Sequence, residues 1–170
     1  MFNIAVTLTN IYVAWRWGDW RNWRIYHTTI LYMIVCDLLY NFLTYNHSLW
    51  TYTHTTFQPN HTLINVFVMF IAYPCMVLIY LGRFPKTFIR GILWVLLWVV
   101  LWSLFEWISL KLGQFSYQNG WTLGWSIIFN IAIFLMVRLH YSKPLLAYGL
   151  SIIATIFMLY IFKVPISKMK

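Results

Sequence analysis

Residues 25–45 read IYHTTILYMIVCDLLYNFLTY, a run of 21 residues without Lys or Arg. A helix of this length can cross the roughly 30 Å hydrocarbon core of a bilayer. Asp37 lies near its middle, and Tyr40, Asn41 and Thr44 follow at spacings that place them on the same helix face. An acid in hydrocarbon costs several kcal/mol unless it meets a partner or a polar cavity. The run therefore predicts a membrane-spanning helix whose polar face points toward other helices.

The composition of the whole chain is that of a membrane protein. Its 170 residues are 62% hydrophobic and 9% charged, with a mean hydropathy of +0.70. A soluble domain averages about 45–50% apolar and about 25% charged residues. We expect an all-α, polytopic transmembrane helix bundle that forms one domain over residues 1–170. Five spans are predicted, at about 25–45, 63–82, 88–110, 121–139 and 144–162.

The first fifteen residues leave three alternatives open. Residues 1–14 reach only about 21 Å as a helix, which is less than the hydrocarbon thickness. Residues 1–15 are therefore a short sixth span, a half-inserted helix or an interfacial helix. The following segment WRWGDWRNWR (15–24) alternates tryptophan with arginine, a pattern typical of an anchor at the membrane surface.

The net charge of +9 is concentrated in connections and at helix ends, which points to anionic lipid head groups and not to nucleic acid. Eight of the 12 Lys and Arg residues fall on one side, in connections 16–24, 83–90 and 138–143. The other four fall in 111–120 and 163–170, and none in 46–62. The positive-inside rule makes the first set cytoplasmic.

Depths along the predicted spans place five polar side chains in the outer half of the bundle: Asp37, Asn41, Asn65, Glu106 and Asn130. One interpretation is an outward-facing polar cavity that accepts a cation, a proton or an amine-bearing head group. The other is a set of hydrogen bonds between helices. Under the first, the candidate ligand-binding residues are Asp37, Tyr40, Asn41, Trp102, Glu106 and Asn130.

No metal or cofactor is predicted. The loop 46–62 contains three histidines at seven-residue intervals, His47, His54 and His61, but no Cys, Asp or Glu accompanies them. His27 and His140 lie near the cytoplasmic ends of two spans, which is an ordinary position for histidine and weak support for haem. The two cysteines, Cys36 and Cys75, lie in apolar spans and are expected to be free thiols.

Several motifs resemble a family of small multi-pass membrane proteins that is abundant in spore-forming Gram-positive bacteria and is named only after a clostridial locus. They are DLLYNFLTYNHSLW (37–50), YP (73–74), RFPK (83–86), FEWISLKLGQFSYQNGW (105–121) and RLHYSKPLLAY (138–148). The resemblance covers about residues 17–148, and the family pattern includes a glutamate at Glu106. It implies a multi-pass protein of the bacterial cytoplasmic membrane. The family has no assigned activity.

Three function classes remain. The leading one is a non-enzymatic membrane module that binds a small ligand, a lipid head group, another membrane protein or a second copy of itself. The second is a proton- or cation-coupled transporter, which needs a polar path from Asp37 to the cytoplasm, whereas the inner half offers little beyond His27, Thr28 and Thr29. The third is a lipid-modifying enzyme with Asp37 or Glu106 as general base, although no catalytic motif is present.

Overall fold

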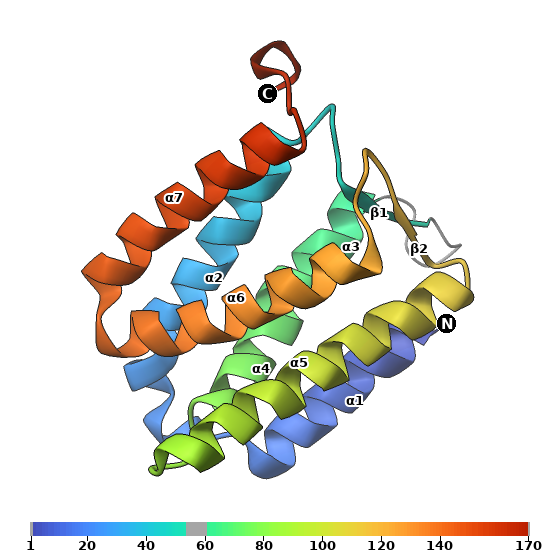
Figure 1. Cartoon of the computed structure of the whole chain (residues 1–170). Coiled ribbons are helices and arrows are strands. Elements are labelled where there is room, and N and C mark those ends of the chain that lie inside the picture. Colours follow the sequence, from blue (N-terminus) through green and yellow to red (C-terminus); the bar gives the residue numbers. More distant parts are fainter. Residues whose placement is uncertain (1, 54–60, 170) are drawn as a thin grey trace.

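The computed structural model describes residues 2–53 and 61–169 (Figure 1). Its long helices are α1 (Phe2–Trp17), α2 (Trp23–Leu43), α5 (Phe88–Lys111), α6 (Leu123–Ser142) and α7 (Pro144–Ile161). A further helix is built from α3 (His61–Phe67), the π-helical turn η2 (Val68–Ala72) and α4 (Tyr73–Tyr80). Short 3₁₀ turns are η1 (Trp20–Asn22) and η3 (Ile166–Lys168), and the strands are β1 (Trp50–Tyr52) and β2 (Phe115–Tyr117).

Four helices are long and apolar enough to cross a membrane: Thr62–Tyr80, Phe88–Lys111, Leu123–Ser142 and Pro144–Ile161, with mean hydropathies of 2.2, 2.1, 1.6 and 2.0. This confirms a helical membrane protein, but four spans are found by length and composition, so the expectation of five is wrong by that measure. The helix that falls short is α2. Its 21 residues are long enough, but Asp37, Asn41 and His27 lower its hydropathy.

The central core lies between α2, α4, α5 and α6. Tyr80 and Phe134 are fully buried there, and the Tyr80 hydroxyl donates to the Phe134 carbonyl at 2.9 Å. Trp98 packs against both rings. These contacts fix α4 against α5 and α6 with large side chains.

A proline interrupts the α3–α4 helix, as its position in the predicted span suggests. Pro74 has no backbone N–H, and the turn just before it is π-helical, with the Tyr73 N–H bonded to the Val68 carbonyl five residues earlier. The extra residue in this turn rotates the following side chains by roughly 100° relative to a regular helix. Tyr73 follows the turn directly, so its direction depends on this irregularity.

The amino-terminal helix α1 packs along α4. Ala14 is fully buried against Cys75 and Ile79. The ends of the two helices lie next to each other. Just after α1, the Asp19 N–H donates to the carbonyl of Leu78, near the end of α4, at 3.2 Å. Gly82 is needed at this approach, since a Cβ there would lie 2.6 Å from the Asp19 Cβ.

The basic connections meet at the same end of the bundle. The Arg83 Nε donates to the Trp17 carbonyl at 2.8 Å, and the Arg138 guanidinium lies 4.7 Å from the centre of the Phe84 ring. This agrees with the grouping of 16–24, 83–90 and 138–143 on one side.

A small antiparallel sheet, which an all-α prediction does not include, joins two connections at the opposite end. Trp50 pairs with Tyr117, and Tyr52 pairs with Phe115. In Figure 1 the sheet lies near the start of α3 and the end of α5. Phe162 and Val164 after α7 are buried next to Leu49 and Trp121 at this end.

Candidate functional site: a cavity beside Asp37

The Asp37 carboxylate is held by two donors from different helices. Asn41, one turn further along α2, donates from Nδ2 to Oδ1 at 2.9 Å, and the Tyr73 hydroxyl donates to Oδ2 at 2.8 Å. Asn65 extends the network by donating to the Asn41 Oδ1 at 2.7 Å. The polar face of α2 therefore points to the α3–α4 helix, and the π-helical turn delivers the Tyr73 hydroxyl to the acid.

Beside Asp37 lies a cavity of about 180 Å³, bordered by α2, α4, α6, α7 and the segment that leads into β1. Its walls are largely apolar, with Met33, Ile133 and Met158 among them. Among the described residues that line it, Asp37 is the only carboxylate, and none is Lys, Arg or His. An apolar cavity with a few convergent polar groups is the usual form of a small-molecule site.

A second polar group of the cavity joins α2 to α7. The Tyr32 hydroxyl and the Ser151 Oγ are 2.5 Å apart, and Ser151 donates to the Ala147 carbonyl, so Tyr32 is the donor of this pair. The Cys36 thiol lies close to both hydroxyls. The Tyr32 ring is itself fixed by stacking on His140 at 4.2 Å.

The outer end of the cavity is covered. The Tyr40 ring stacks on Trp50 with 4.1 Å between centroids and 5° between planes. The Tyr40 hydroxyl accepts from the Leu49 N–H at 3.1 Å, and Leu49 is 1% exposed. Leu49, Trp50 and Val164 line the cavity at this end, so Asp37 lies beneath a cover of aromatic and apolar side chains.

Glu106 belongs to a different network. Its Oε1 accepts from the Tyr117 hydroxyl at 2.9 Å and from the Ser126 hydroxyl, and Ser126 in turn accepts from the Trp121 indole at 2.7 Å. These contacts tie α5 to β2 and to the start of α6. Glu106 does not belong to the residues that line the cavity.

The six candidate residues thus separate into two groups. Asp37 and Tyr40 line the cavity, and Asn41 supports Asp37 from behind. Asn130 donates to the Ser103 hydroxyl at 3.2 Å and lies close to Glu106. Trp102 lies between the groups, with its ring 6.3 Å from that of Tyr73 and 5.7 Å from that of Phe134.

Tyr52 of β1 lies near both acids. Burial of its hydroxyl, together with the charges of Asp37 and Glu106, raises the pKa of Tyr52 well above its ordinary value. Tyr52 is therefore neutral and can only donate or accept a hydrogen bond. The charges of both carboxylates act on Tyr52, but of the two acids only Asp37 lines the cavity.

Several residues of the site have no clear signature in the sequence. Tyr32 and Ser151 are single hydroxyls in apolar helices 119 positions apart. Tyr73 is the exception, because its position before a proline marks an irregular helix, although the pattern says nothing about its partner.

The three histidines whose side chains the structure describes have separate partners. His140 is buried, with Nδ1 3.0 Å from the Thr29 hydroxyl, and His27 is exposed with its ring 5.6 Å from Trp23. The His47 Nε2 lies 3.2 Å from the Phe162 carbonyl, and His54 is outside the described residues. Within the described part of the chain, no three His, Cys, Asp or Glu side chains are placed to hold a metal ion.

Comparison with known proteins adds no relative. No family model matches the chain, and no curated protein or solved structure is similar to it.

Proposed function

We propose that this protein is a membrane-embedded binding module whose cavity takes a small cationic or amine-bearing ligand through Asp37. The supporting observation is the Asp37 carboxylate, which lies on the wall of an apolar cavity without a basic residue among its described lining. A carboxylate in such surroundings gains most from a ligand that brings a positive charge or several N–H donors.

The same proposal includes six crossings of a bacterial cytoplasmic membrane, with the ends of the bundle oriented by its basic connections. It is supported by α1, which lies along α4, and by the polar network of α2, which faces α4. The basic end then contacts anionic head groups. Cysteine at Gln118 should react with an impermeant thiol reagent in intact cells and cysteine at Lys86 should not; the reverse pattern would invert the orientation.

Binding is favoured over transport and catalysis by the packing around the cavity. Tyr80, Phe134 and Val137, each at most 1% exposed, fill the core on the cytoplasmic side of Asp37. A transported ion would need a polar path through these side chains. For two-carboxylate chemistry a second acid would have to reach the cavity, and the Glu106 Oε1 instead accepts two hydrogen bonds elsewhere.

The test uses two probes of nearly equal shape, benzylamine and benzyl alcohol, with purified protein in detergent micelles. Benzylamine should raise the midpoint of thermal unfolding at lower concentration than the alcohol, by roughly 10-fold or more, because a tenfold preference requires only about 1.4 kcal/mol. Asp37→Asn keeps the side-chain shape and should remove this preference. Glu106→Gln is the matched control and should retain it. Equal binding of amine and alcohol by the unaltered protein would contradict the proposal.

A further inference from the structure

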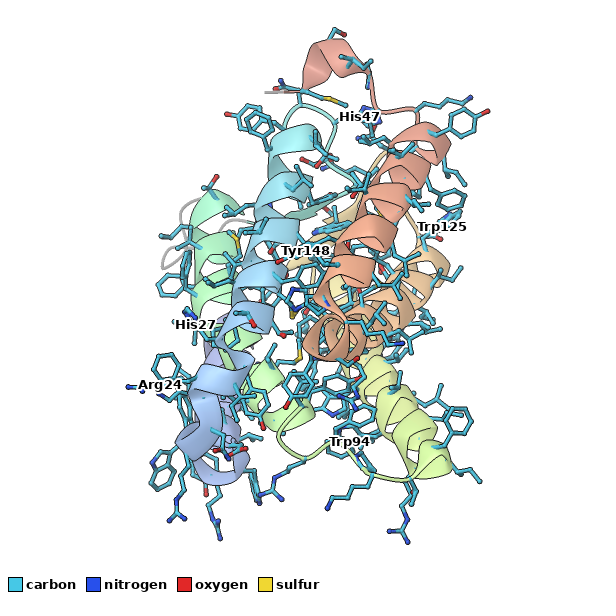
Figure 2. All side chains as sticks on the ribbon, turned by 90° about the vertical axis from the view of Figure 1, so that its left-hand side faces the viewer. Arg24, His27, His47, Trp94, Trp125 and Tyr148 are labelled. Atoms are coloured by element: carbon cyan, nitrogen blue, oxygen red, sulfur yellow. The ribbon has the colours of Figure 1, made fainter. Side chains whose placement is uncertain are left out.

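The cavity has one wall that is held only loosely. Helix α7 packs along α6, whereas α2 packs against α4 and α6, so the two helices that flank the cavity contact each other little. Of the residues in the membrane-spanning part of α7, only 6% are buried inside the protein. Figure 2 views this side of the molecule, with α2 and α7 facing the viewer and Tyr148 between them.

We call this boundary the α2–α7 seam and define it by Tyr32 and Cys36 on α2 and by Tyr148 and Ser151 on α7. Two side-chain contacts cross it: the Tyr32–Ser151 hydrogen bond and an edge-to-face contact of Tyr32 with Tyr148 at 5.6 Å. A change of the Tyr32 rotamer would break both contacts, together with the stack of Tyr32 on His140. The α7 residues that line the cavity next to Ser151 are small, Ala154 and Thr155, which leaves space behind the seam.

The seam faces the hydrocarbon of the bilayer. On α2 the neighbouring side chains Leu31 and Val35 are 45% and 57% exposed, and on α7 Ile152 is 62% exposed. Elsewhere the cavity meets packed groups: the Tyr40–Trp50 stack lies at one end, and the Tyr80–Phe134 pair fills the core beyond the other end. The weakest boundary of the cavity is thus the one that adjoins lipid.

We infer that the cavity is loaded sideways from the bilayer through the α2–α7 seam, and that its ligand is a membrane-soluble amine. This rests on the proposed function, because Asp37 supplies the reason for an amine. The seam adds that the rest of the ligand is apolar and dissolves in lipid. At about 180 Å³ the cavity is slightly larger than a cavity of about 150 Å³ that holds benzene, so it accepts one ring or a short alkyl branch.

The test cross-links the seam through a native thiol. Cys36 lies close to Ser151, so Ser151→Cys places two thiols across the seam, and Cys75→Ser removes the second native cysteine. The protein is reconstituted in liposomes and oxidised with copper phenanthroline, and binding of radiolabelled benzylamine is followed by filtration. The oxidised form should take up the probe at least 10-fold more slowly than the same protein after reduction. The control carries Ile152→Cys instead, whose side chain points outward, and should bind equally before and after oxidation.

Each outcome separates the two proposals. Equal uptake by the cross-linked and the reduced forms would overturn loading through the seam and leave the Asp37 site intact. Uptake that Asp37→Asn does not change would overturn the proposed function itself. If the cross-link does not form, Cys36 in the Cys75→Ser protein is labelled in liposomes with neutral N-phenylmaleimide and with an anionic maleimide. The neutral reagent should react at least 10-fold faster, and equal rates would exclude loading from the bilayer.

Discussion

Asp37 and Glu106 are chemically similar groups in comparable positions, and the protein uses them differently. Each lies in the C-terminal half of a long helix and accepts a tyrosine hydroxyl, at 2.8 Å for Asp37 and 2.9 Å for Glu106. Asp37 receives one donor on each oxygen and borders a cavity. Glu106 receives two donors on one oxygen and connects three elements of the fold.

The difference lies in what surrounds the acid. The neighbours of Glu106 come from β2 and the start of α6, so its hydrogen bonds maintain the outer end of the bundle. The neighbours of Asp37 leave one side facing open space. A buried acid in a membrane helix is therefore not by itself a sign of function, and the free volume beside it separates a binding group from a structural one.

The largest effect on stability is expected for Glu106→Ala, which disrupts the hydrogen bonds of the structural acid. It leaves the hydroxyls of Tyr117 and Ser126 without their acceptor, and each unpaired buried donor costs about 1–3 kcal/mol. We expect the free energy of unfolding to fall by about 2–4 kcal/mol, measured by urea titration in detergent micelles. Glu106→Gln keeps an oxygen at the Oε1 position and should lose less than about 1 kcal/mol. Equal losses for Ala and Gln would show that the charge matters and the acceptor does not.

Trp50→Ala should open the cavity beside Asp37. Loss of the indole removes the stack on Tyr40 and opens the outer end to water, with a stability cost of about 1–3 kcal/mol for a half-buried tryptophan. In the Cys75→Ser background an anionic maleimide should then label Cys36 at least 10-fold faster. Phe70→Ala, a change at a ring that is 60% exposed, serves as control and should leave the rate unchanged. An unaltered rate in the Trp50 variant would mean that other side chains close the outer end.

A matched pair of smaller changes sharpens the contrast. Tyr73→Phe and Tyr117→Phe each delete one hydroxyl that donates to an acid, and each should lower stability by about 1 kcal/mol. Only Tyr73→Phe should also weaken benzylamine binding, because the charged form of Asp37 loses a donor that stabilises it. Titration of both variants with benzylamine tests this. An equal loss of affinity in both variants would show that the Asp37 and Glu106 networks act as one binding site.

The smallest effect is expected at a third acid, outside the spans. Hydrogen bonds from Asn22 and from Tyr26 lower the pKa of Asp19 below its ordinary value of 3.8. Burial acts in the opposite direction but does not outweigh them. Its contribution to stability is present above that ordinary value and is lost as the pH falls through the lowered one. Asp19→Asn should therefore lower the stability slightly at pH 7 and flatten the acid limb of the stability curve. An unchanged stability at pH 7 together with an unchanged acid limb would contradict this role of Asp19.

Much of the helical architecture follows from the sequence, and its exceptions have physical causes. Apolar runs of sufficient length predict α5, α6 and α7 directly, since only a helix satisfies the backbone in hydrocarbon. Asp37 marks α2 as inward-facing, but the same acid lowers the hydropathy of that helix below that of the four clear spans. The strands β1 and β2 are three residues each, and their pairing depends on partners far apart in the chain, so no local pattern indicates it.

For the candidate site, the sequence predicts only how deep each polar residue lies in the helix bundle. Asp37 and Glu106 lie at similar positions in their helices, which suggests that both acids face one cavity. The side chains that separate them belong to other segments of the chain. Tyr52 and Trp50 lie in a connection without periodicity, and the direction of Tyr73 depends on a π-helical turn. The sequence could identify the polar residues of the outer half, and only packing could divide them into two networks.

The pairing of β1 with β2 also has a consequence for how the chain is made. Thr51 and Ser116 lie 65 residues apart, so the ribosome completes β1 long before its partner strand exists. The sheet can form only after α3, α4 and α5 have been released into the membrane. The remaining walls, α6 and α7, and Val164 all follow β2 in the chain. The cavity beside Asp37 is thus completed only after α7 has been made, and a nascent chain stalled before α6 carries an acid in hydrocarbon without the helices that border its cavity.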